Sequence, residues 1–212
     1  MASGIPNISK AEFLADWSAL HNNAPTDGIV GAWLSISYRF ALIATLLRIS
    51  PNYLTLFGLL SALATALTSQ SLWAIFFLVL SLFFDGIDGS VAIFQKRASN
   101  FGTILDSVAD RISEALWLFA LYRIGAPAYI CILLWSVASV QEYARARIAS
   151  LGVADIGVIT PAERPVRASF LFIALIIWQL SLPWISGFSI IFLVVQVWSL
   201  IKVIFFARGQ LH

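Results

Sequence analysis

The chain has 212 residues, of which 60% are hydrophobic and 11% are charged, and its formal net charge is +2. Soluble domains are about 45–50% apolar and about 25% charged, so this composition excludes a soluble globular enzyme and a disordered chain. It predicts an all-α integral membrane protein. The small net charge gives no indication of a nucleic-acid partner, and the single cysteine, Cys131, excludes an intramolecular disulfide.

The N-terminal segment, residues 1–50, is expected to lie on the cytoplasmic side of the membrane. Residues 9–12 read Ser-Lys-Ala-Glu, a capping box that predicts the start of a short helix. Residues 29–48 are apolar but contain Arg39 and Arg48. They therefore predict a helix in or near the membrane interface, with a true span as the alternative.

Six apolar runs of spanning length follow, and they define a predicted membrane domain over residues 51–212. A span needs about 20 mostly apolar residues, and the runs lack the period-two alternation of barrel strands. The predicted fold is therefore a bundle of six transmembrane helices behind an N-terminal interfacial helix. The runs cover residues 52–70, 71–92, 103–123, 127–148, 166–185 and 187–206.

Lysine and arginine residues predict the orientation of these helices. They gather in the N-terminal segment, around the connections 93–102 and 149–165, and at the C-terminal end. Because cytoplasmic loops carry an excess of Lys and Arg, both connections and both termini are expected to face the cytoplasm. The expected location is the plasma membrane.

Four aspartates stand where the second and third spans approach the first charged connection. Asp85 and Asp88 are three residues apart and share one helix face. Asp106 and Asp110 are four apart and share a face of the next helix. If the two spans are antiparallel neighbours, the carboxylates converge and favour Mg²⁺ or Mn²⁺, with two ions expected. The alternative is a pair of polar helices that satisfy each other, with Arg111 neutralising one carboxylate.

Glycines accompany both pairs of aspartates. Gly86 and Gly89 flank the first pair, and Gly102 precedes the second. Without a side chain, the backbone can approach a phosphate or a sugar closely. Metal-ligating acids, close backbone and a membrane together indicate phosphoryl chemistry on a lipid-linked substrate.

These acids and glycines resemble the signature of the CDP-alcohol phosphotransferases over residues 85–92 and 102–110. All four acids and both signature glycines match in spacing. The arginine that the family has after Ala92 is Ile93 here. Either Arg97, one helical turn further on, replaces it, or the donor is held differently. The resemblance covers roughly residues 50–205.

The resemblance implies a transferase that moves a phosphatidyl group from CDP-diacylglycerol to an alcohol and releases CMP. It implies Asp85, Asp88 and Asp106 as metal ligands, and Asp110 as a ligand that is also the catalytic base. It further implies a homodimer, and a site for the cytidine diphosphate part of the donor. The residues expected in that site are Asn52, Tyr53, Leu54, Thr55, Asp85, Gly89, Arg97 and Ser99.

A second cluster of cations indicates the acceptor. Several cations near one cytoplasmic pocket would bind an acceptor that carries its own phosphate; they are Arg145, Arg147, Arg164, Arg167 and Lys202. The pattern Arg-Ala-Arg at 145–147, followed by Glu-Arg-Pro-Val-Arg at 163–167, is similar to that in the actinobacterial phosphatidylinositol phosphate synthases. This resemblance implies that Arg145, Arg167 and Lys202 hold inositol phosphate, a phosphorylated small polyol. Glycerol phosphate, the acceptor of a phosphatidylglycerol phosphate synthase, is the close competitor. The alternative is that these cations contact the phosphates of membrane lipids.

Two other acids of the apolar runs have expected partners. Glu114 is expected to neutralise Arg111 or Lys202, and Glu142 to orient Arg145 from one turn away.

Two other protein classes are alternatives to a transferase. A membrane cation transporter would place its acids near the bilayer midplane, whereas the four aspartates of this chain cluster at one membrane face. An inactive family member retained as an assembly subunit would fit the missing arginine.

Overall fold

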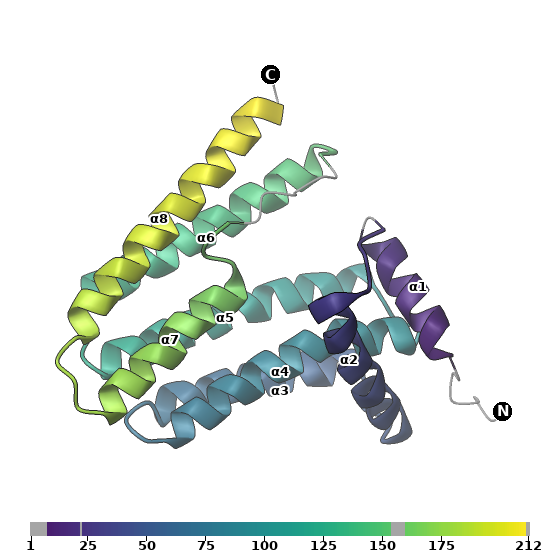
Figure 1. Cartoon of the computed structure of the whole chain (residues 1–212), viewed down its shortest axis with the longest axis horizontal. Helices are drawn as coiled ribbons and strands as arrows, with labels where there is room; N and C mark the ends of the chain where they lie inside the picture. The colour runs from purple at the N-terminus through teal and green to yellow at the C-terminus, as the bar shows by residue number, and fades with distance from the viewer. Residues whose placement is uncertain (1–7, 22, 154–159, 211–212) are drawn as a thin grey trace. The chain divides into compact units, whose positions relative to one another are not determined.

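The computed structural model describes residues 8–21, 23–153 and 160–210, and all regular secondary structure within them is helical, with no strand. Eight helices follow one another (Figure 1), which confirms the all-α prediction. The largest difference from the predicted runs is at α7, which ends at Gln179 rather than at residue 185. The helices are α1 (Lys10–Leu20), α2 (Gly28–Leu46), α3 (Pro51–Leu67), α4 (Trp73–Phe94), α5 (Asn100–Arg123), α6 (Ala128–Ser150), α7 (Arg164–Gln179) and α8 (Ile185–Gln210).

Among the described residues, three helices are long and apolar enough to cross a membrane: α2, α4 and α8. The α3 helix is apolar but shorter. The α2 helix, expected at the interface with a span as the alternative, has the length and composition of a span. The count of six spans and the interfacial position of the N-terminal helix stay predictions.

Helix ends follow from the local sequence. The Ser9 hydroxyl accepts a hydrogen bond from the N–H of Glu12 at 3.2 Å, so the predicted cap at the start of α1 is confirmed. The α4 helix ends at Phe94. After it, Lys96 has a left-handed φ of 52°, and the N–H of Arg97 donates to the carbonyl of Ala92 at 2.8 Å. This turn carries the chain from α4 toward α5.

The chain forms two compact units. Unit 1 comprises Met1–Ser61 and Leu80–Asp110, and unit 2 comprises Ala62–Val79 and Arg111–His212. Unit 1 therefore contains α1, α2, the first part of α3, the last part of α4 and the start of α5. Unit 2 contains α6, α7, α8 and the remaining parts of α3, α4 and α5.

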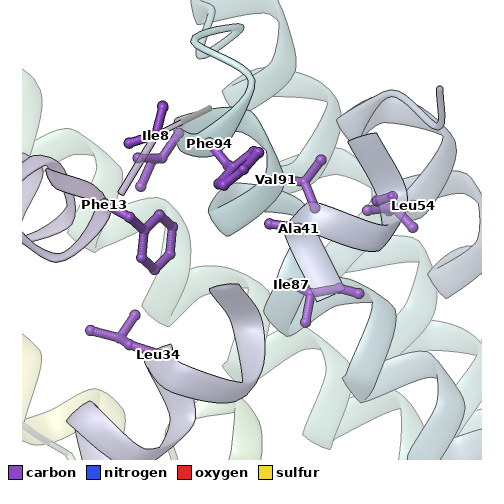
Figure 2. Close-up of a cluster of buried hydrophobic side chains, with 10 residues drawn as sticks. Ile8, Phe13, Leu34, Ala41, Leu54, Ile87, Val91 and Phe94 are labelled. Carbon is purple, nitrogen blue, oxygen red and sulfur yellow. The ribbon is translucent and has the colours of Figure 1, made fainter. Parts of the chain in front are cut away.

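A buried apolar cluster joins the first four helices within unit 1 (Figure 2). Phe13 of α1, Ala41 of α2 and Val91 of α4 are fully buried in it. The Tyr38 hydroxyl donates to the carbonyl oxygen of Ile8 at 3.0 Å, which ties the segment before α1 to α2. The cluster also contains Leu34, Ala44, Leu54, Ile87, Ile93 and Phe94.

In unit 2, α6 and α8 lie side by side (Figure 1). The amide of Gln196 on α8 donates to the side-chain oxygen of Gln141 on α6 at 2.9 Å, and both residues are fully buried. Polar bonds of this kind join helices in membranes, where apolar contact with lipid competes with apolar contact between helices.

Candidate active site

Three carboxylates come together in unit 1. Oxygens of Asp85 on α4 and of Asp106 and Asp110 on α5 all lie within 4.8 Å of one another, and the three side chains are partly buried. Like charges this close repel one another, and a divalent cation among them would offset that repulsion. Anionic oxygens are also the ligands that Mg²⁺ and Mn²⁺ prefer. The donor set therefore fits a hard divalent cation, as the sequence predicted.

Asp88, the fourth predicted ligand, has a different environment. It is buried, and the Thr55 hydroxyl donates to its Oδ2 at 2.6 Å. Because Thr55 belongs to α3, this bond joins α3 to the turn of α4 that carries the acid. Asp88 still lies close enough to Asp85 and Asp106 to interact electrostatically with both. Its role as a ligand stays a prediction.

Two glycines set how closely neighbouring helices approach the acidic turn of α4. A Cβ added to Gly58 of α3 would lie 3.4 Å from the carbonyl oxygen of Ser81 and 3.6 Å from the backbone nitrogen of Asp85. A Cβ added to Gly86 would lie 2.7 Å from the ring of Trp33 on α2. The space over Gly86 thus accommodates a tryptophan rather than a substrate.

A cavity of about 270 Å³ lies beside these acids in unit 1. Asp88 and Asp106 line it, and Gly89 opens onto free space at the position where a side chain would be. Of the residues expected to bind the donor, five line this cavity. They are Asn52, Thr55, Gly89, Arg97 and Ser99.

The other residues expected to bind the donor lie elsewhere. Tyr53 is exposed, Leu54 is buried in the apolar cluster, and Asp85 belongs to the group of three carboxylates. Helical spacing could have found two further lining residues, because Ala92 follows Asp88 by one turn and Thr103 precedes Asp106 by one turn. No local signal indicated Leu20 or Ala98, which also line the cavity.

Arg145, in unit 2, is held by a carboxylate. Its Nη1 donates to Oε2 of Glu163 at 2.9 Å, and the Thr160 hydroxyl donates to Oε1 of the same carboxylate at 2.7 Å. Burial raises the pKa of Glu163, but the hydrogen bonds from Arg145 and Thr160 outweigh it and leave the pKa below its ordinary value. Glu163 is the N-cap residue of α7, so this contact fixes where α7 begins relative to α6.

Arg167, on α7, is more deeply enclosed, with 5% of its surface exposed. Its Nε donates to Glu114 at 2.9 Å, and its Nη2 donates to Glu142 at 2.9 Å. Its Nη1 donates to the carbonyl of Ala162 at 3.0 Å. All three nitrogens of this guanidinium therefore have partners inside the protein.

The partners of the two glutamates are partly as predicted. Arg111 donates to both oxygens of Glu114, at 2.6 and 3.2 Å, so the predicted pairing of these two is confirmed. Glu142 was expected to orient Arg145, and the structure shows it bound to Arg167. Lys202, the third predicted acceptor residue, is exposed on α8.

Comparison with known proteins places this geometry in a family. The family model for CDP-alcohol phosphatidyltransferases matches residues 48–206. The archaetidylinositol phosphate synthase of Aeropyrum pernix is 38% identical over 111 residues, which is 50% of this chain and 57% of that protein. The phosphatidylinositol phosphate synthase of Mycobacterium tuberculosis is 34% identical over 139 residues, 58% of this chain and 61% of that protein. The matched regions thus span about three fifths of each relative.

Solved structures of the mycobacterial synthase share the fold. The structure with CDP-DAG bound has a TM-score of 0.64 and 21% identity, and the match covers 80% of this chain and 90% of that one. The structure in complex with manganese and citrate also has a TM-score of 0.64, covering 81% of this chain and 88% of that one. The family model alone covers three quarters of the residues. The chain therefore belongs to the CDP-alcohol phosphatidyltransferase family.

Proposed function

We propose that this transferase moves a phosphatidyl-type group from a CDP-linked lipid to inositol phosphate and releases CMP. The observation that carries the proposal is the cavity of unit 1, where Asn52, Gly89 and Ser99 stand beside the signature aspartates. The names of the relatives support the acceptor, because the archaeal and the mycobacterial enzymes are both synthases of inositol phosphate lipids. The names of the two enzymes differ in the lipid part of the product, which is archaetidyl in the archaeal enzyme and phosphatidyl in the mycobacterial one. CDP-diacylglycerol is the proposed donor, supported by the mycobacterial structure that binds it.

The proposed cofactor is Mg²⁺ or Mn²⁺, as two ions. Asp85, Asp106 and Asp110 would hold it, with Asp88 as the fourth proposed ligand. A bound divalent cation stabilises the charge that develops on a diphosphate as its bond breaks. The manganese in a mycobacterial structure of the same fold supports a divalent metal.

The chain's own residues would bind and orient the donor. The open space over Gly89 lets a diphosphate approach the backbone. Asn52 and Ser99 offer polar groups, and Arg97 brings a positive charge to the cavity wall. Tyr53, Leu54, Thr55 and Asp85 complete the proposed donor set.

Proton transfer is assigned to Asp110. The attacking hydroxyl of the acceptor must lose its proton as its oxygen bonds to the lipid-linked phosphorus and CMP departs. A carboxylate at the acceptor side of the site can take that proton. Asp110 stands one turn beyond Asp106 on α5, within the group of three carboxylates, and is the proposed base.

The proposed acceptor site consists of Arg145, Arg167 and Lys202. Arg145 presents its guanidinium to the two oxygens of Glu163, and the same planar arrangement of donors suits a phosphate. An acceptor phosphate would therefore compete with Glu163 for Arg145. Arg167, whose donors are used inside the protein, would act by holding the start of α7 in place.

The protein is a membrane protein, as its family and the three helices of spanning length and hydropathy in the described part of the chain indicate. We further propose a plasma-membrane homodimer with an N-terminal segment over residues 1–50 and a domain of six spans over 51–212. Both termini would face the cytoplasm. Single cysteines at positions 97 and 150, in a Cys131→Ala background, should both react with an impermeant thiol reagent from the cytoplasmic side. Labelling from opposite sides would refute this topology, and chemical cross-linking in membranes tests the dimer.

The experiment that tests the function is an acceptor screen with purified protein and Mg²⁺ or Mn²⁺. CDP-diacylglycerol is offered with inositol phosphate, glycerol phosphate, inositol or serine, and CMP release and the lipid product are measured. We expect the fastest release with inositol phosphate. A preference for glycerol phosphate would make the protein a phosphatidylglycerol phosphate synthase. No release with any acceptor, and none with a CDP-linked archaeal lipid, would favour a cation transporter or an inactive assembly subunit.

A further inference from the structure

We infer that α1 forms part of the donor site, with the Leu20 side chain packing against the nucleoside of the CDP-linked lipid. This inference rests on the proposed function and adds a residue that the family signature lacks. The α1 helix ends at Leu20 and precedes residues 48–206, which match the family model. It therefore belongs to a part of the chain that the family model does not describe.

Leu20 stands at the wall of two adjacent cavities. It lines the cavity of about 270 Å³ that holds the signature acids. It also lines a cavity of about 490 Å³ whose wall includes Asp16 and Lys96. The two cavities share four lining residues and are therefore contiguous. The shared residues are Leu20, Ala92, Ile93 and Ala98.

The order of residues along α4 shows which end of the donor cavity Leu20 occupies. A helix rises about 1.5 Å per residue, so Ile93 lies about 7.5 Å further along α4 than Asp88. The acids mark one end of the cavity, and the apolar wall of Leu20, Ala92 and Ile93 marks the other. The diphosphate joins the nucleoside to the lipid and has to reach the acidic end. In the proposed topology the lipid extends along the membrane helices, so the nucleoside extends toward the apolar end, beside the charged connection 93–102. Apolar walls with a few polar groups are the usual surroundings of such a ligand.

The position of α1 is fixed by contacts that do not involve Leu20. Phe13 is fully buried in the cluster of unit 1. Glu12 forms an ion pair with Lys96 at 3.4 Å, next to the turn that follows α4. Leu20 itself is 63% exposed. Its side chain can therefore be shortened without removing a core residue.

The presence of Ile93, where the family signature has an arginine, is consistent with this role for α1. Ile93 is 9% exposed and belongs to the same apolar cluster as Phe13. An arginine there would have to lose its water among apolar side chains, which is costly without a partner. The α1 helix thus packs over the position from which the family arginine acts, and Leu20 gives this end of the cavity an apolar contact in its place.

The test compares Leu20→Ala with Leu47→Ala. Leu47 is the same residue type, also in unit 1, and is 65% exposed, so the two variants lose the same atoms at similar exposure. With full-length protein and Mn²⁺, the dissociation constants of CMP and of inorganic pyrophosphate are measured, together with KM for both substrates. We expect Leu20→Ala to weaken CMP binding and raise the donor KM about three- to tenfold, since part of a leucine's apolar contact is lost. Pyrophosphate binding and the acceptor KM should not change, and Leu47→Ala should alter none of these values.

Two results would overturn the inference. In the first, Leu20→Ala binds CMP as tightly as Leu47→Ala does. In the second, Leu20→Ala weakens CMP and pyrophosphate equally, which would place its effect on the diphosphate rather than on the nucleoside. A wild-type protein that binds neither CMP nor CDP-diacylglycerol would instead refute the proposed function on which the inference rests.

Discussion

The two units use charge in opposite ways. In unit 1, the oxygens of Asp85, Asp106 and Asp110 lie within 4.8 Å of one another, so like charges face each other. In unit 2, carboxylates and guanidinium groups alternate along a chain of ion pairs. Its members are Arg111, Glu114, Arg167 and Glu142. A bound cation would offset the repulsion between like charges held together, whereas alternating charges satisfy one another. In this apolar chain, the arrangement of positive and negative side chains therefore indicates the candidate ligand site better than the number of charged residues does.

The alternating chain predicts the largest effect on stability. Glu114→Gln should lower the free energy of unfolding by about 3–5 kcal/mol, because it leaves two guanidinium groups without their shared carboxylate in a buried place. The measurement is a denaturant or SDS unfolding titration in detergent. The control is Glu12→Gln, which breaks the exposed pair with Lys96 and should cost about 1 kcal/mol or less. Equal effects of the two variants would contradict a structural role for the buried chain.

The like-charge cluster predicts the largest effect on activity. Asp106→Asn should reduce CMP release by about 100-fold or more, the scale on which a lost electrostatic group acts at a reaction centre. A chelator should abolish activity, and added Mg²⁺ or Mn²⁺ should restore it. Asp27→Asn removes an exposed carboxylate outside the cluster that makes no side-chain cap bond, and it should leave the rate unchanged. Full activity in EDTA would contradict the metal mechanism.

Arg145 combines the two situations, because it has an internal partner, Glu163, and a proposed ligand, the phosphate of the acceptor. Arg145→Lys keeps the charge but loses the planar pair of donors, so we expect the KM for inositol phosphate to rise about tenfold, the equivalent of one charge-assisted hydrogen bond. The donor KM and kcat should stay near their original values. The control is Arg147→Lys, an exposed arginine in the last turn of α6. A rise in the donor KM instead would identify the cluster as a donor or lipid-headgroup site.

Asp106→Asn should also change stability, and in EDTA its effect should be opposite to that of Glu114→Gln. In EDTA, Asp106→Asn removes one of three neighbouring negative charges, so we expect its thermal midpoint to rise above that of the wild type. With saturating Mn²⁺ the order should reverse, since a ligand that binds the folded state stabilises it. Glu114→Gln should be less stable under both conditions. An Asp106→Asn protein that is less stable in EDTA would show that unit 1 also depends on internal pairing.

The smallest effect concerns Glu163. Because its folded pKa lies below its ordinary value of 4.5, its contacts stabilise the protein at higher pH and are lost as pH falls through the folded pKa. The difference in unfolding free energy between wild type and Glu163→Gln should be about 1 kcal/mol or less, since the pair is partly exposed. It should be constant above about pH 5 and shrink at lower pH. A difference that grows on acidification would mean that the pKa is raised.

Sequence reasoning succeeded where the information is local. The capping box at residues 9–12 is a pattern of four consecutive residues, and the structure shows the Ser9 cap at the start of α1. The acids on α4 and α5 were expected to meet because a short connection joins two adjacent helices, and the oxygens of Asp85, Asp106 and Asp110 do meet. The pairing of Arg111 with Glu114 follows from a spacing of three on one helix.

It failed where contacts depend on tertiary packing. Leu20 reaches the cavity of Ala92 from a separate helix, and no spacing in the sequence relates those two positions. Gly86, like Gly89, was expected to let a phosphate or a sugar approach the backbone, yet the Trp33 ring fills the space over it. Glu142 is one turn from Arg145, but its oxygen binds Arg167, which is 25 positions away. Each of these contacts depends on how helices from distant parts of the chain pack together.

The pair on α5 also has a consequence for biosynthesis. Glu114 has one partner three positions away on its own helix and another 53 positions later in the chain. The chain emerges from the ribosome N-terminus first, so α5 is made well before α7. In the proposed six-span topology, α5 crosses the membrane. A carboxylate that enters a membrane without a partner costs several kcal/mol, and Arg111 would neutralise Glu114 while the rest of the protein is still being translated. Arg167 would then join a pair that already exists, so a nascent chain that ends before residue 164 could insert α5 without its final partner.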